Sequence, residues 1–139
     1  MEMNKINRLL IGASVGGLLC LSCASYAGVT VINNLKTNVT VKLGYLSSGL
    51  ATKQYLKVCD GPSTLAYQGK VTFKATTPVA CSGAAKDNAL ILAFKMNYQS
   101  QAFQGNCHGL SDNATITISA DSSSQLGISI TTTQGSCSS

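Results

Sequence analysis

The sequence predicts an all-β fold, namely a small antiparallel β-sandwich or barrel of about seven or eight strands that is stabilised by disulfides. Three observations support this class. Short segments alternate between apolar and polar residues with a period of two, as half-buried strands do. Val, Ile, Thr and Tyr are frequent, whereas the chain after residue 27 contains no Glu, Arg or Trp. The same part of the chain carries four cysteines, Cys59, Cys81, Cys107 and Cys137.

The first 27 residues have the pattern of a secretory signal peptide. Residues 1–8 are polar and include Lys5 and Arg8, residues 9–21 form an apolar run, and Ser25 and Ala27 are small residues at the −3 and −1 positions before Gly28. We therefore expect cleavage after Ala27 and a secreted or periplasmic protein. The compact basic region favours a bacterial source.

A membrane-spanning helix and a lipoprotein signal are the two alternative interpretations of this leader. The apolar run is shorter than the roughly 20 residues of a membrane-spanning helix, and no later segment approaches that length, so we expect no transmembrane segment after processing. A lipoprotein would be modified at Cys23, but Cys20 occupies the position three residues earlier, where a lipoprotein signal normally has Leu. We therefore favour a cleaved, unlipidated form.

Residues 28–139 have the length of one domain. They contain eight Lys and four Asp, which gives a formal charge of about +4. An even number of cysteines in a small exported domain indicates two disulfides, with three possible pairings. We expect Cys59–Cys81 to join two successive strands, and Cys107–Cys137 to tie a polar loop to the C-terminal tail. One His and no Cys-x-x-Cys motif after residue 27 argue against a metal site or other cofactor.

In the first half of the domain, residues 29–32 and 39–45 alternate and are separated by Asn, Lys and Thr residues, which predicts a hairpin. Residues 52–59 and 70–76 form further strands, and the Asp60-Gly61-Pro62-Ser63 segment between them is a turn signal. Phe73 and Ala75 are expected to face the core.

In the second half, residues 81–88 are small and predict a loop. Residues 89–98 are apolar on both faces, which predicts a strand at the centre of the structure, with a short buried helix as the alternative. Residues 99–113 are rich in Gln, Asn, Ser and Gly and predict a long polar loop. Residues 114–120 and 126–133 alternate again and predict a hairpin with Leu126 facing inward.

No residue pattern predicts catalysis. His108 adjoins Cys107, but adjacent residues on an extended chain point in opposite directions, and a disulfide-bonded Cys107 is not nucleophilic. Each Asp lies in a turn-like context, where Asp is common for structural reasons. Five lysines occupy expected solvent-facing strand positions and would form a basic, anion-binding face if their strands were neighbours: Lys42, Lys53, Lys57, Lys70 and Lys74.

These features favour an exported, non-enzymatic binding or structural domain of the cell envelope or extracellular space. Its partner would be an anionic surface, a glycan or another envelope protein, contacted through residues 61–69, residues 99–113 or the basic face. Specific nucleic-acid binding is not expected, because Arg and aromatic residues are sparse. Two alternatives remain open: a secreted membrane-active or host-directed factor, and a small hydrolase that uses a pair of Asp residues.

Overall fold

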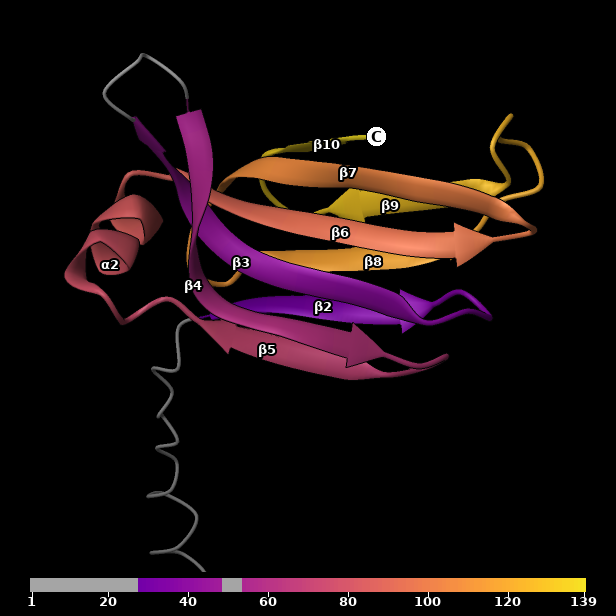
Figure 1. Cartoon of the computed structure of the whole chain (residues 1–139), viewed down its shortest axis with the longest axis horizontal. Coiled ribbons are helices and arrows are strands. Elements are labelled where there is room, and N and C mark those ends of the chain that lie inside the picture. The colour runs from indigo at the N-terminus through magenta and orange to yellow at the C-terminus, as the bar shows by residue number, and fades with distance from the viewer. Residues whose placement is uncertain (1–27, 49–53) are drawn as a thin grey trace, which may run out of the picture.

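A computed structural model describes residues 28–48 and 54–139, in which nine strands and one short helix form a disulfide-linked β-sandwich (Figure 1). The all-β prediction is therefore confirmed, with slightly more strands than expected. The predicted signal peptide, including Cys20 and Cys23, and the candidate residue Lys53 lie outside the described residues.

The strands form two sheets that face each other. The five-stranded sheet has the order β10 (Ser136–Ser138), β7 (Gln101–Leu110), β6 (Leu90–Tyr98), β3 (Val39–Ser48) and β4 (Gln54–Leu65). The four-stranded sheet has the order β5 (Lys70–Lys74), β2 (Gly28–Asn34), β8 (Thr115–Ala120) and β9 (Ile128–Thr132). All pairs are antiparallel except β2 and β8, which run parallel, so the sandwich is not purely antiparallel.

The core lies between the sheets and is built from one face of each strand. On β6, Leu90, Leu92, Phe94 and Met96 are buried, and this strand lies third in its sheet, which confirms the predicted central strand. On the four-stranded sheet the buried residues include Val29, Val31, Phe73, Ile116 and Ile118. Each of these side chains removes apolar surface from water, which stabilises the fold by about 1.5–3 kcal/mol for a full-sized aliphatic or aromatic group.

The predicted hairpin between residues 29–32 and 39–45 is wrong, because β2 and β3 belong to different sheets. Both strands turn an apolar face inward, and this pattern suits strands on opposite sides of a core as well as paired strands. Asn33, near the end of β2, and Leu35, just after it, are both fully buried. The Asn33 amide donates to the carbonyl oxygens of Thr37 at 2.8 Å, Leu65 at 3.0 Å and Ala66 at 3.1 Å. The connection by which the chain passes from one sheet to the other is therefore held in place by the buried side chain of Asn33.

The predicted polar loop over residues 99–113 is also wrong, since most of it forms strand β7. A tight turn joins β6 to β7, and its two central residues, Gln99 and Ser100, have φ angles of 53° and 67°. Two positive φ angles are typical of the type I′ hairpin turn, which usually contains Asn-Gly or Asp-Gly. The sequence pattern did not predict this strand, because Gln-Ser is not a usual turn pair and the outward residues of β7 are polar.

The loop predicted at residues 81–88 is wrong, because most of this segment belongs to helix α2 (Val79–Lys86), on which Cys81, Ala84 and Ala85 are buried. Alanine has the highest helix propensity, and the alanines of this segment favour a helix over a loop. Cys59 of β4 is bonded to Cys81, so the predicted disulfide is present but joins a strand to a helix rather than two successive strands.

The other predicted disulfide, Cys107–Cys137, joins β7 to β10. These two cysteines lie opposite each other in the strand register. The predicted hairpin in the last third is confirmed by the antiparallel pairing of β8 with β9. Leu126, however, is 47% exposed and does not face the core, because β9 begins only at Ile128.

Candidate functional site

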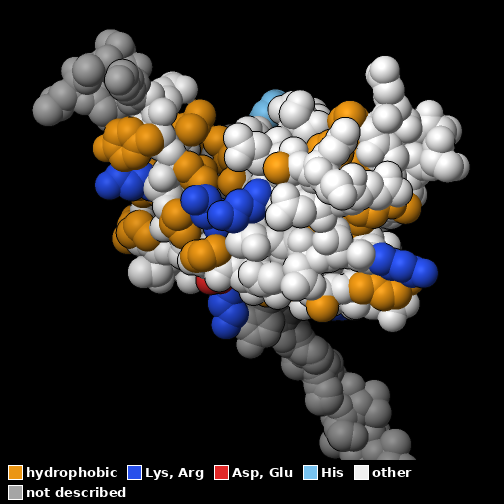
Figure 2. Space-filling view, turned by 45° about the vertical axis from the view of Figure 1, so that its right-hand side comes forward, with side chains coloured by type: hydrophobic (Ala, Val, Ile, Leu, Met, Phe, Trp, Pro, Cys, Tyr) orange, Lys and Arg blue, Asp and Glu red, His pale blue; other side chains and the backbone are white. Residues whose placement is uncertain are grey.

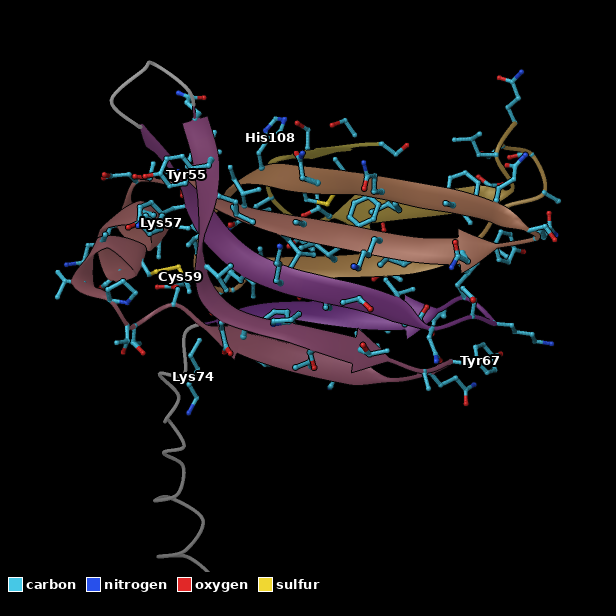
Figure 3. All side chains as sticks on the ribbon, in the orientation of Figure 1. Tyr55, Lys57, Cys59, Tyr67, Lys74 and His108 are labelled. Carbon is cyan, nitrogen blue, oxygen red and sulfur yellow. A yellow bond between two sulfur atoms is a disulfide. The ribbon has the colours of Figure 1, made fainter. Side chains whose placement is uncertain are left out.

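The four candidate lysines that the structure describes, Lys42, Lys57, Lys70 and Lys74, do not form one basic face. β4 and β5, which carry three of them, belong to different sheets. Lys42 lies on the outer face of the five-stranded sheet, whereas Lys70 and Lys74 lie on the outer face of the four-stranded sheet, since they alternate with the inward Val71 and Phe73. Lys57 stands over the Tyr55 ring at 5.6 Å on the part of β4 near α2, well away from Lys74 (Figure 3).

A different lysine pair does come together. Lys42 of β3 pairs in register with Ala93 of β6, and Thr40 pairs with Lys95. Lys42 and Lys95 are therefore diagonal neighbours on the same outer face, about 7–8 Å apart at Cα. Both side chains are exposed. Lys95 was not among the predicted site residues, although a lysine between Phe94 and Met96 is an exception on the most apolar strand.

These two lysines line a hollow on the outer face of the five-stranded sheet, here called the lysine groove. Its volume is about 720 Å³, and its outward side chains come from four adjacent strands. A second hollow of about 640 Å³ continues along the same face and shares Thr40, Lys95 and Gln104 with the first. The main lining side chains of the lysine groove are Thr40, Lys42, Val58, Pro62, Ala93, Lys95, Gln104 and Asn106.

The strand β4 forms one wall of the groove because it is irregular there. Its register with β3 shifts between Val41 and Gly44, so that Gly61 and Pro62 bulge opposite Lys42. Gly61 has a φ of 93°, a conformation that residues other than glycine rarely adopt. The turn that the sequence predicts at residues 60–63 is thus a bulge within a continuous strand, which bends the strand without ending it.

The groove is electropositive. Among the described residues, no Asp lines either hollow, and neither Lys42 nor Lys95 forms an ion pair. Asp60, which precedes the lining residue Gly61 in sequence, accepts hydrogen bonds from the backbone N–H groups of Gly61 at 2.8 Å and Lys74 at 3.0 Å, so its carboxylate is directed toward β5. Two like charges at neighbouring sheet positions repel each other, and a bound anion would relieve that repulsion.

His108 and Cys107 point to opposite sides of β7, as expected for neighbours on a strand. Cys107 is fully buried and disulfide-bonded, whereas His108 is exposed and its Nε2 lies 3.4 Å from the Ser136 hydroxyl (Figure 3). The imidazole therefore lies on the outer face of the five-stranded sheet. All four cysteines in the described part of the chain are disulfide-bonded, so none of them offers the imidazole a free thiol.

The Asp side chains that have described hydrogen bonds hold local backbone structure. Asp121 accepts from the hydroxyl of Ser123 at 2.6 Å and from its N–H at 2.9 Å in the β8–β9 turn. These hydrogen bonds, the hydroxyl one foremost, lower the pKa of the Asp121 carboxyl below its ordinary value of 3.8. Over residues 28–48 and 54–139, no three His, Cys, Asp or Glu side chains are grouped as metal ligands.

The outer face of the four-stranded sheet is rich in hydroxyl groups. Thr72, Thr30 and Thr115 lie side by side on β5, β2 and β8, and the Thr133 hydroxyl accepts a hydrogen bond from the Thr115 N–H at 2.9 Å. Thr30 and Thr72 are joined through their hydroxyl oxygens at 3.0 Å. Several of these hydroxyls therefore bond within the protein, and none of these four threonines lines the lysine groove or the second hollow.

None of the described helices is long and apolar enough to cross a membrane. No protein-family model matches the chain, and no curated protein is similar to it in sequence. Function is therefore inferred from the lysine groove. The segments expected to bind as loops do contribute to it, since Pro62 comes from residues 61–69, and Gln104 and Asn106 come from residues 99–113. They do so from strands, where their orientation is fixed.

Proposed function

We propose that this protein is an exported, non-enzymatic binding domain of the cell envelope or the extracellular space, and that the lysine groove binds an acidic glycan. The observation that carries the proposal is the pair Lys42 and Lys95, which share one hollow without a carboxylate partner among the described residues. Export is supported by the leader pattern of residues 1–27 and by two disulfides, which are typical of oxidising compartments.

The shape and lining of the groove favour a chain-like ligand. The two adjoining hollows run along the face and offer amide groups from Asn38, Asn97, Gln104 and Asn106. Amides both donate and accept hydrogen bonds, as sugar hydroxyls do. The two ammonium groups would contact carboxylate or sulfate groups on the sugar rings. Because they are exposed, their attraction is weak and decreases as salt is added.

Binding of a sulfated or uronic-acid polysaccharide, measured by isothermal titration calorimetry, tests this proposal. The double substitution Lys42→Gln/Lys95→Gln is expected to weaken binding about tenfold, which corresponds to about 0.7 kcal/mol for each lost contact. The matched control is Lys70→Gln/Lys86→Gln, which removes the same charge from surfaces outside both hollows. It is expected to change the affinity less than threefold.

Two results would contradict the proposal. Equal losses in the groove variant and the control would show that net charge alone attracts the polysaccharide. Unchanged binding in the groove variant would place the site elsewhere. Thermal unfolding of both variants checks that the fold is retained, as expected for exposed side chains.

A further inference from the structure

The lysine groove changes in polarity along its length. The outward residues of β3 are, in order, Thr40, Lys42, Gly44 and Leu46, because Val39, Val41 and Leu43 face the core. This face of β3 therefore carries, in order, a hydroxyl, an ammonium group, a position without a side chain and an aliphatic side chain. Figure 2 shows the same change of character on the surface, where lysine side chains lie beside a group of apolar ones.

The apolar end consists of Leu46, Leu56 and Val58, here called the apolar ledge. Leu46 is 48% exposed and Val58 is 43% exposed. Leu46 lies opposite Leu56, and Gly44 lies opposite Val58, in the register of β3 with β4. Val58 also lines the lysine groove, so the ledge and the groove form one continuous surface.

Gly44 keeps this surface unbroken. A Cβ at this position would lie 3.0 Å from Leu56 Cδ1 and 2.2 Å from the Lys57 carbonyl oxygen. The missing side chain leaves room for Leu56 to pack against the backbone of β3 at Gly44. Large aliphatic side chains grouped on a surface and bordered by polar residues mark interaction sites in soluble proteins.

We propose that the ligand is an acidic glycolipid, an inference that rests on the proposed function and names its ligand class. The sugar would lie along the amide-lined end, its anionic groups at Lys42 and Lys95, and an acyl chain on the apolar ledge. Charge complementarity places the anionic groups of the ligand at the two lysines, and the exposed aliphatic groups beside them favour a ligand with an apolar portion. A glycan without acyl chains leaves the ledge in water, and a flat bilayer surface does not fill a hollow of about 720 Å³.

The test compares intact lipopolysaccharide with its fully deacylated saccharide, each immobilised at matched density, by surface plasmon resonance at physiological salt. The wild-type protein is expected to bind the intact glycolipid about tenfold more tightly, because a few methylene groups are buried on the ledge. Leu46→Gln/Val58→Thr should remove this difference. The matched control Leu126→Gln/Val79→Thr changes the same residue types at exposed positions elsewhere and should preserve it.

The outcomes separate this inference from the proposed function. Equal binding of both ligands, with loss in Lys42→Gln/Lys95→Gln, would overturn the glycolipid and leave the acidic-glycan groove in place. Equal or tighter binding to phosphatidylglycerol vesicles would overturn it in favour of a membrane surface. Binding of neither ligand, together with no polysaccharide binding, would refute the proposed function itself.

Discussion

Asn33 is the only polar side chain among the fully buried residues of the described structure. Its carboxamide accepts a hydrogen bond from the Leu35 N–H at 2.9 Å and donates to three carbonyl oxygens. Two of these belong to Leu65 and Ala66 at the far end of β4. One side chain thus satisfies backbone groups at the point where the chain crosses from one sheet to the other. A buried amide with all its partners is costly to remove, because the groups left behind have no water to replace it.

The substitution Asn33→Leu has nearly the same volume but no hydrogen-bonding groups. It is expected to lower the free energy of unfolding by about 1–3 kcal/mol, through the carbonyl oxygens left without a donor. Urea unfolding monitored by circular dichroism measures this loss. Asn34→Leu, at the exposed neighbouring position, is the control and should change stability little. A midpoint for Asn33→Leu equal to that of the wild type would show that the network contributes nothing.

The sequence could not reveal this role. Asn33-Asn34 is a common turn signal, and it does lie at the end of a strand, but nothing local distinguishes the buried Asn from the exposed one. Its partners Leu65 and Ala66 are more than thirty residues away along the chain. The groove lysines show the same limit, because Lys42 and Lys95 become neighbours only through the pairing of β3 with β6.

At the scale of elements, the strands with clear alternation and the strongly apolar strand β6 were predictable, whereas β7 and helix α2 were not. β5 and the β8–β9 pair were identified because their apolar residues occupy every second position between turn signals. β7 was missed because its inward face carries Phe103, Gly105 and Cys107, with only one large apolar side chain among them. Gly105 is there for a steric reason, since a Cβ would lie 2.2 Å from the Ser138 carbonyl oxygen and 2.8 Å from the Phe94 ring.

Two glycine-to-alanine substitutions separate packing from propensity. Gly105→Ala is expected to destabilise the protein by about 1–3 kcal/mol, because the added methyl group collides with the backbone of β10 and the strand must shift. Gly83→Ala, in the middle of α2 with no atom within 4 Å of the new Cβ, should stabilise it by about 0.5–1 kcal/mol. Guanidinium unfolding of the two variants in parallel should give shifts of opposite sign. Shifts of the same sign would refute the steric account of Gly105.

At the scale of the whole molecule, the two disulfides fasten elements that the sheets alone hold loosely. Cys59–Cys81 attaches α2 to β4, and Cys107–Cys137 attaches the three-residue strand β10 to β7. The number of cysteines and the expected export of the protein predicted two bridges. Their pairing was one of three possibilities, and the identity of the joined elements depended on a helix that was not predicted.

Removing either bridge by paired Cys→Ala substitution is expected to cost about 3–4 kcal/mol, from loops closed at sequence separations of 22 and 30 residues. Unfolding of Cys59→Ala/Cys81→Ala and Cys107→Ala/Cys137→Ala by guanidinium, compared with the wild type, measures each cost. The wild type treated with a reductant should lose at least as much as either variant. A wild-type midpoint that does not respond to reduction would argue that the bridges are unimportant for stability.

The parallel pairing of β2 with β8 has a consequence for how the chain acquires its structure. β2 lies between β5 and β8, and Thr30 is in register with Thr115, so the middle of the four-stranded sheet joins the first third of the chain to the last. Such distant pairings make folding slow, because a long loop must close before the contact is made. An emerging chain therefore cannot complete the four-stranded sheet until β8 becomes available. If the leader directs export as proposed, this delay keeps the four-stranded sheet unfolded while the polypeptide passes through a narrow export channel.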